Sequence, residues 1–175
     1  MKNLMQQAWQ FVNNVTQKQQ RKGFKLTHLH PYTDEIGNLE YIKFRLKNNT
    51  TNEKYIRSIS LDSQGNWQMR EPDFKSENKL KPIYRLHEIK KEINPIYIFE
   101  GEQKCDIANK LGFISTTSGG SSTVDSHDWR SLNYHQVVLW RDNDKAGLNW
   151  LKDMLKMLDQ LTGIDVIIID IEKLN

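Results

Sequence analysis

The sequence predicts an α/β protein, with a mostly parallel sheet covered by helices on both faces, a small antiparallel β lobe before it, and an N-terminal helix. Two patterns lead to this prediction. In the second half of the chain, short apolar runs without alternation are separated by helix-like segments. Between Leu26 and Met69, apolar and polar residues instead alternate with a period of two. We therefore expect two domains, 1–91 and 92–175.

The first domain should begin with a helix over residues 2–20. Apolar residues recur there at helical spacing on one face, namely Leu4, Ala8, Phe11 and Val15. An antiparallel meander should follow, because Ile42, Phe44 and Leu46 alternate with basic residues and turn-rich segments interrupt the pattern.

The outward face of this meander should carry a strip of cations. Its expected members are Lys43, Arg45, Lys47, Lys54 and Arg57. Tyr55 and Trp67 could stack on bases beside the strip, as aromatic residues do in proteins that bind single strands. The alternative interpretation is a polar face that simply remains solvated.

The second domain should alternate strands with helices. The expected strands are 96–99, 113–116, 136–140 and 166–169, and the expected helices are 103–111 and 145–161. In the long helix the inward stripe should comprise Leu151, Met154, Leu155, Leu158 and Leu161. A polar connector, 78–91, should separate the two domains.

Composition narrows the cellular setting. The single cysteine, Cys105, excludes a disulfide within the chain and a cysteine-based zinc cluster, and it favours a reducing cytoplasm. The longest apolar run, VIIIDI, is interrupted by Asp170, so no membrane-spanning segment is expected.

The charge is unevenly distributed between the two expected domains. Residues 1–91 hold 17 Lys or Arg against 9 Asp or Glu, whereas residues 92–175 hold 8 against 13. A basic lobe that holds a polyanion and an acidic lobe that holds a divalent cation would suit this asymmetry.

Carboxylates follow two of the expected strands directly. Glu100 comes after the first strand, and Asp142 and Asp144 come after the third. If these strands are neighbours in a parallel sheet, their carboxyl ends bring the three side chains together, and like charges need a cation between them. Oxygen ligands alone favour Mg²⁺ or Mn²⁺. The alternative is that Asp142 merely caps the helix that begins near Lys145.

Four motifs in this region resemble those of the Toprim domain, in particular the primase modules of phage and plasmid primase-helicases. The matching segments are Glu100 to Lys104 (EGE followed by a lysine, with Gln103 inserted), Thr117 to Gly120, Trp129 to Leu132, and Asp142 to Gly147. Two upstream segments, Tyr32 to Leu39 and Tyr84 to Leu86, fit the same pattern. The resemblance covers about residues 26 to 170.

The resemblance implies a Toprim catalytic domain in residues 92–175, with Glu100, Asp142 and Asp144 as catalytic residues and ligands of Mg²⁺ or Mn²⁺. It implies a primase-type nucleotidyltransferase that uses nucleoside triphosphates on a single-stranded DNA template during DNA replication, with a replicative helicase as a candidate partner. Lys104 and Arg141 are candidates for phosphate contacts, unless they are plain counter-charges. Lys43, Arg45 and Arg57 are candidates for nucleic-acid binding.

Three features depart from the family pattern. The chain has no zinc-binding module and no GxxxxGK[ST] phosphate loop, since SGGSS at 118–122 lacks the lysine. The further acidic residues that relatives often carry are represented at most by Asp170. Two other functions therefore remain open, a non-catalytic nucleic-acid-binding module and a metal-dependent nuclease.

Overall fold

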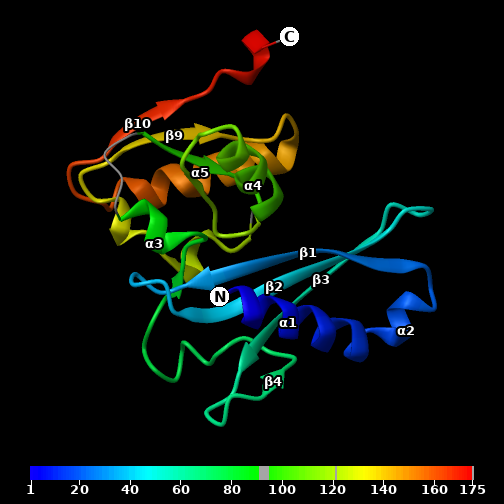
Figure 1. Ribbon diagram of the computed structural model, residues 1–175. Coiled ribbons are helices and arrows are strands. Elements are labelled where there is room, and N and C mark those ends of the chain that lie inside the picture. The colour runs from blue at the N-terminus through cyan, green and yellow to red at the C-terminus, as the bar shows by residue number, and fades with distance from the viewer. Residues whose placement is uncertain (91–94, 121, 175) are drawn as a thin grey trace. The chain divides into compact units, whose positions relative to one another are not determined.

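The computed structural model describes residues 1–90, 95–120 and 122–174, which form two compact units (Figure 1). The first unit comprises Met1–Tyr32 and Asn38–Asp73, and the second comprises Thr33–Gly37 and Phe74–Asn175. The domain boundary expected at residues 91 and 92 lies outside the described residues. The described part of the expected connector, 78–90, belongs to the second unit, which resumes at Phe74.

The first unit consists of two helices and one sheet. Its elements are α1 (Lys2–Val15), α2 (Gln17–Gln20), β1 (Phe24–Thr33), β2 (Leu39–Asn48), β3 (Lys54–Leu61) and β4 (Trp67–Gln68). The sheet order is β1-β2-β3-β4, and both β2–β3 and β3–β4 are antiparallel. The turns are closed by side chains, because Asn48 Oδ1 and Asp62 Oδ1 accept hydrogen bonds from main-chain N–H groups of the residues that follow them.

The core of the first unit lies between α1 and the apolar face of β2 and β3. Ala8 and Val12 of α1 pack there with Ile42, Phe44, Leu46 and Ile59. The expected helical stripe was therefore partly wrong. Val12 is buried whereas Val15, the last residue of the helix, is 41% exposed.

The second unit is built on a parallel sheet of order β10-β9-β6-β7. Its strands are β6 (Ile96–Phe99), β7 (Ser115–Thr116), β9 (Gln136–Trp140) and β10 (Asp165–Ile168). β6 pairs with β9 in parallel, from Ile96 opposite Val137 to Phe99 opposite Trp140. The first and third strands are thus neighbours, which is the condition for the carboxylates that follow them to meet.

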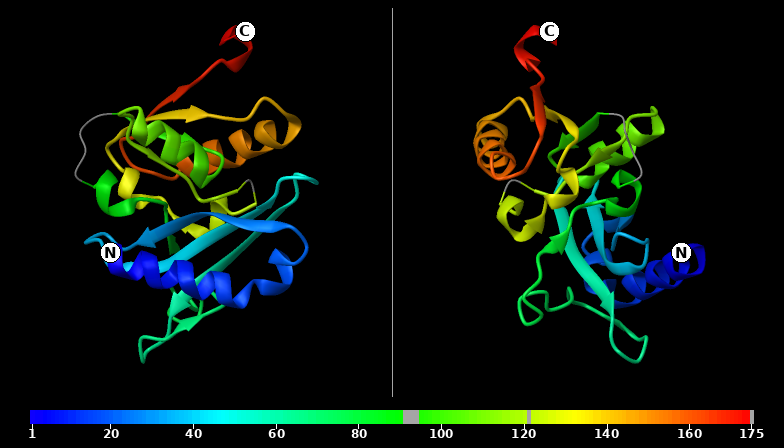
Figure 2. Two further views of the ribbon diagram at one scale, coloured as in Figure 1. Left: turned by 45° about the vertical axis from the view of Figure 1, so that its right-hand side comes forward. Right: turned by 90° about the vertical axis from the view of Figure 1, so that its left-hand side faces the viewer.

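Helices α4 (Glu102–Lys110) and α5 (Lys145–Leu158) lie on opposite faces of this sheet (Figure 2). Right-handed crossovers produce this arrangement, because β6–α4–β7 and β9–α5–β10 step in opposite directions along the sheet. The described part of the chain is therefore mixed α/β, with an antiparallel sheet in the first unit and this four-stranded parallel sheet in the second.

A core of the second unit lies between α5 and the parallel sheet. Trp150, Met154 and Leu158 pack there on Ile96 and Ile98 of β6 and on Val137 and Leu139 of β9. The expected stripe on this helix was again partly wrong, because Trp150 is buried and Leu155 is 36% exposed. The helix also ends at Leu158, three residues earlier than expected.

Short elements complete the second unit. They are β5 (Lys81–Pro82), α3 (Leu86–Ile89), β8 (His127–Asp128) and three 3₁₀ turns at Val124–Ser126, Arg130–Leu132 and Ile171–Leu174. β5 pairs with β8 in parallel. In the described parts of the chain, no helix combines the length and the apolar character needed to span a membrane.

Candidate active site

Glu100 and Asp142 meet at the carboxyl ends of β6 and β9. Because Phe99 is paired with Trp140, the two strands end at the same level of the sheet. The main-chain N–H of Asp142 donates a hydrogen bond of 3.0 Å to Glu100 Oε1. Two segments separated by 42 residues in sequence are therefore joined directly at the sheet edge.

Gly147, in the first turn of α5, makes this contact possible. A side-chain carbon at position 147 would lie 2.8 Å from Glu100 Oε1 and would overlap the main-chain O of Asp142. Glycine is needed here because of close approach, since its φ does not lie in the left-handed region. The sequence motif DND-x-AG includes Gly147 but gave no indication of this role.

Asp144 caps α5. Its carboxylate accepts a hydrogen bond of 2.7 Å from the main-chain N–H of Gly147, which satisfies one of the unpaired donors of the first helical turn. The alternative in which Asp142 was the cap is thus wrong. The cap is two residues later, because α5 begins at Lys145 and its N-cap position is Asp144.

The carboxylate of Asp142 forms an ion pair with the ammonium of Lys104, which lies in the first turn of α4. The two side chains are about equally half-exposed, at 40% and 41%. Helix α4 starts directly after Glu100 and Gly101, and this short connection brings Lys104 back over the end of the sheet. Lys104 is therefore part of the site.

Glu100 is the carboxylate whose proton affinity the site changes most clearly. Burial raises its pKa above the ordinary value of 4.5, Lys104 and Arg141 oppose this effect, and the charge of Asp144 adds to it. Glu100 thus responds to the charge of both Asp144 and Lys104, because these groups are close in space.

The side chain of Arg141 contacts the main chain of the next residue, Asp142. Its guanidinium donates a hydrogen bond of 2.9 Å to the main-chain O of Asp142 and lies 3.8 Å from Glu172 Oε1. Only 10% of its side chain is exposed. In this conformation it supports the Asp142 loop and offers little surface to a phosphate.

Thr117 organises the end of the neighbouring strand β7. Its Oγ1 accepts hydrogen bonds from the main-chain N–H groups of Gly101, at 3.1 Å, and Gly119, at 2.9 Å. Both glycines have positive φ, which explains why a residue without Cβ stands at each position. Thr117 is fully buried, and its role was missed from the sequence although it stands in one of the quoted motifs.

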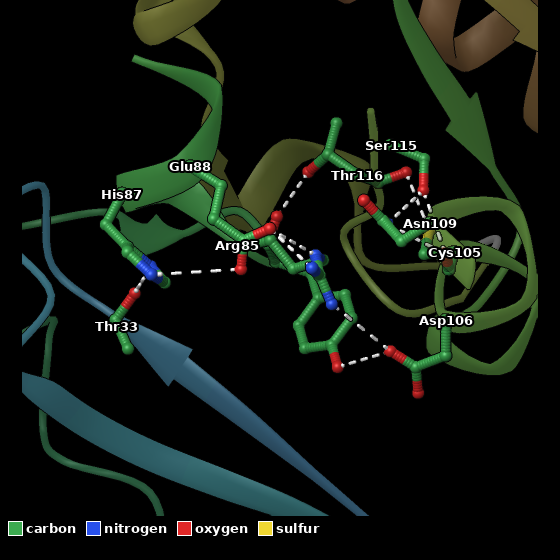
Figure 3. A network of polar contacts seen from close by, with 10 residues as sticks. Thr33, Arg85, His87, Glu88, Cys105, Asp106, Asn109, Ser115 and Thr116 are labelled. Carbon is green, nitrogen blue, oxygen red and sulfur yellow. Dashed lines mark hydrogen bonds and ion pairs between the residues drawn. The ribbon is translucent and has the colours of Figure 1, made fainter. Parts of the chain in front are cut away.

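A polar network holds the segment before α3 against β7 and α4. Tyr84 N–H donates to Thr117 O at 2.9 Å, and Thr116 Oγ1 donates to Tyr84 O at 2.7 Å. The Tyr84 hydroxyl donates to Asp106 Oδ1 at 2.8 Å, and burial, followed by the Asp106 charge, raises the pKa of this hydroxyl. Figure 3 shows Arg85 between Glu88 and Asp106, and it pairs with both. This network fixes the position of Thr117.

The site has the donor chemistry of a divalent metal site, although its carboxylates are turned to other partners. No three His, Cys, Asp or Glu side chains among residues 1–90, 95–120 and 122–174 are arranged to hold one ion. Oxygen donors nonetheless come together, and a cation, the Lys104 ammonium, already contacts one of them. Carboxylate oxygens are the donors that a hard divalent ion prefers, and Glu100, Asp142 and Asp144 supply them at one edge of the sheet.

The basic residues of the first unit lie on two different faces of their sheet. Lys43 and Arg45 alternate with buried Ile42, Phe44 and Leu46, and Arg45 stands opposite Ile56. Arg57 is directly opposite Phe44, so it projects from the face that carries the core. The expectation of one strip containing Arg57 was therefore wrong, because a shift of one position moves a strand residue to the other face.

Two of these cations also have aromatic neighbours within the first unit. Lys43 Nζ lies 5.0 Å from the ring centre of Tyr32 and 3.3 Å from its hydroxyl oxygen. Arg57 lies 4.8 Å from the ring centre of Tyr55. Such contacts stabilise a cation over an aromatic face.

Comparison with known proteins gives no family assignment. No protein-family model matches the chain, and neither a curated protein nor a solved structure matches it.

Proposed function

We propose that the second unit is a Toprim catalytic domain and that the chain acts as a primase core. It would transfer nucleotides from nucleoside triphosphates to a growing RNA strand on a single-stranded DNA template during DNA replication. One observation carries the proposal, namely that Glu100, Asp142 and Asp144 follow two adjacent parallel strands in a sheet of order β10-β9-β6-β7. Ligands of open parallel sheets bind at this edge.

Asp142 and Asp144 would hold Mg²⁺ or Mn²⁺, and the metal would stabilise negative charge on the phosphate oxygens. Their spacing of two residues and the single hydrogen bond that Asp144 makes as a cap leave carboxylate oxygens for this role. A carboxylate has about four acceptor positions, so capping and metal binding by Asp144 are compatible.

The reaction itself forms one bond and breaks one. The 3′ hydroxyl oxygen of the growing strand attacks the α-phosphorus of a nucleoside triphosphate, and the bond from that phosphorus to the bridging oxygen breaks to release pyrophosphate. Glu100 would accept the hydroxyl proton, and its partial burial strengthens it as a base. Lys104 is the nearest cation for the incoming phosphates.

The first unit would bind the template. Lys43 and Arg45 are on one face of its sheet, and cations that contact phosphates supply much of the affinity for a nucleic-acid strand. A replicative helicase is the partner that a primase core of a phage or plasmid requires. The chain has one cysteine, Cys105, and so no disulfide within it, which suits a reducing cytoplasm.

The test is primer synthesis by the whole chain. Purified protein should extend a short RNA strand on a single-stranded DNA template with Mg²⁺ or Mn²⁺, and Asp142→Asn should abolish this extension. Asp153→Asn, at an exposed position of α5 outside the site, is the matched control and should retain activity. Degradation of labelled DNA without added nucleotides would instead indicate a metal-dependent nuclease.

A second function is favoured by a specific observation. Asp142 is paired with Lys104, Asp144 caps α5, and Glu100 is bonded to the backbone of Asp142. This arrangement is also expected of a non-catalytic nucleic-acid-binding module, in which the carboxylates hold the fold together. In that case Asp142→Asn would leave DNA affinity unchanged, and no primer synthesis would occur with the wild-type chain either.

A further inference from the structure

Lys104 contacts the candidate metal ligand Asp142 across the end of the sheet, although 38 residues separate them in sequence. Its helix, α4, begins one residue after Gly101, and Gly101 is anchored by its hydrogen bond to Thr117. Asp142 is equally fixed, since its N–H is bonded to Glu100 and its carbonyl to Arg141. The contact therefore joins two anchored segments and does not depend on a freely moving loop.

The ammonium of Lys104 acts on two carboxylates. It pairs with Asp142, and its charge also favours the ionised form of Glu100, against the effect of burial on the pKa of that group. The third carboxylate, Asp144, is turned to the N-terminus of α5 and accepts its hydrogen bond from Gly147. The Lys104 ammonium thus contacts a carboxylate that the proposed function assigns to a divalent ion.

We propose that Lys104 is the resident counter-ion of this site and that a divalent cation binds by displacing it from Asp142. The released ammonium is then available to the phosphates that arrive with the metal. This inference rests on the proposed metal site, and it adds a competition between lysine and metal for one carboxylate. Metal binding and phosphate binding are coupled through this exchange, because each releases or captures the same side chain.

The competition has a measurable consequence. A substitution that removes a positive charge near the metal site, but not in contact with a ligand, should strengthen metal binding slightly. A substitution that removes the ammonium paired with the Asp142 carboxylate should strengthen metal binding more. Lys104→Met keeps the length of the side chain and removes its charge. The variant should bind Mn²⁺ at least about three-fold more tightly than the wild-type chain, since a half-exposed ion pair does not have to be broken.

The experiment is a titration of the whole chain with Mn²⁺ alone, followed by the decrease of the free-ion signal in electron paramagnetic resonance. Lys104→Arg retains a cation and should keep the wild-type affinity to within about two-fold. Lys110→Met removes a charge from the exposed end of the same helix and serves as the matched control for long-range electrostatics. Asp142→Asn should weaken binding in both the wild-type and the Lys104→Met background.

The outcomes separate the inference from the proposed function. Tighter binding by Lys104→Met than by Lys110→Met supports the exchange. If the wild-type chain binds Mn²⁺ and Lys104→Met binds it equally or more weakly, the metal site stands and the exchange is overturned. If neither chain binds Mn²⁺, the metal-dependent function and the exchange are both overturned.

The proposed contact of the released Lys104 ammonium with phosphate can be measured separately. With Mn²⁺ present, pyrophosphate should bind the wild-type chain more tightly than without it, and this gain should be smaller in Lys104→Met. Calorimetric titration with pyrophosphate in the presence and absence of Mn²⁺ gives the comparison. An equal increase in pyrophosphate affinity on adding Mn²⁺ to the wild-type chain and to Lys104→Met would show that Lys104 does not contact the phosphate.

Discussion

The basic face of the first unit and the carboxylate edge of the second unit place their charges by different means. On β2 and β3, whether two cations share a face depends on strand register, so Lys43 and Arg45 are together and Arg57 is not. At the ends of β6 and β9, Glu100 and Asp142 are brought together by strand order. A shift of one residue in strand register leaves the same strands as neighbours, so their ends still meet. The same shift moves every side chain of the strand to the opposite face of the sheet.

The strongest way to break the carboxylate edge is Gly147→Ala. Alanine is a better helix former than glycine, by about 1 kcal/mol, yet the added carbon would overlap Asp142 O and press on Glu100. We expect a net decrease of about 1 to 3 kcal/mol in the free energy of unfolding, together with loss of primer synthesis. Urea unfolding measures the first effect.

Gly120→Ala is the control for this substitution. A side-chain carbon at position 120 would meet nothing within 4 Å, and Gly120 does not have a positive φ. It should unfold within about 0.5 kcal/mol of the wild-type chain. If Gly147→Ala were equally harmless, the close packing of Glu100 against the Asp142 loop would be refuted.

Thr117→Val tests the anchor on β7. Valine has nearly the same shape but leaves the N–H groups of Gly101 and Gly119 without their acceptor. The expected cost is about 1 to 3 kcal/mol, measured by thermal or urea unfolding. Thr117→Ser keeps the hydroxyl and should recover most of this stability, and equal destabilisation by serine and valine would argue against the hydrogen bonds.

The salt dependence of DNA affinity distinguishes the sheet face with Lys43 and Arg45 from the face with Arg57. If the face with Lys43 and Arg45 binds single-stranded DNA, Lys43→Ala should reduce the slope of log affinity against log salt by about 0.7 for each phosphate that Lys43 neutralises. Arg57→Ala should leave the slope unchanged, because Arg57 is on the other face. Fluorescence anisotropy of a labelled oligonucleotide measures both, and the reverse ranking would assign binding to the face with Arg57.

The smallest effect concerns the pH dependence of stability. Because burial raises the pKa of Glu100, the folded chain holds this proton more tightly than the unfolded chain, and stability falls as pH rises from below 4.5 through the folded pKa. Glu100→Gln removes this titration. The variant should therefore gain stability relative to the wild-type chain as pH rises from about 4 to about 7 in urea unfolding.

A flat difference between Glu100→Gln and the wild-type chain over this pH range would contradict the proton affinity assigned to Glu100.

Helical periodicity predicted the elements better than it predicted their buried faces. The pattern located α1 and α5, yet it selected Val15 and Leu155 for the interior, where the structure buries Val12 and Trp150. A helical stripe of three or four apolar positions can be drawn in more than one way when apolar residues occur on neighbouring positions. Contact with the sheet, at Ile96, Ile98, Val137 and Leu139 for α5, selects among them.

The sequence by itself predicted the parallel α/β unit from apolar runs that alternate with helix-like segments, and it predicted that Glu100 would meet the Asp142 loop on the condition that their strands are neighbours. The tertiary structure supplied that condition, because it pairs β6 with β9. Only the tertiary structure decided the partner of each charge. The ion pair of Lys104 with Asp142 and the Thr117 anchor depend on distances of a few ångströms between segments remote in sequence. The separation of Arg57 from Lys43 depends on the register of β2 and β3, and the cap made by Asp144 depends on where α5 begins. Periodicity and spacing carry no information on such distances, because packing in three dimensions sets them.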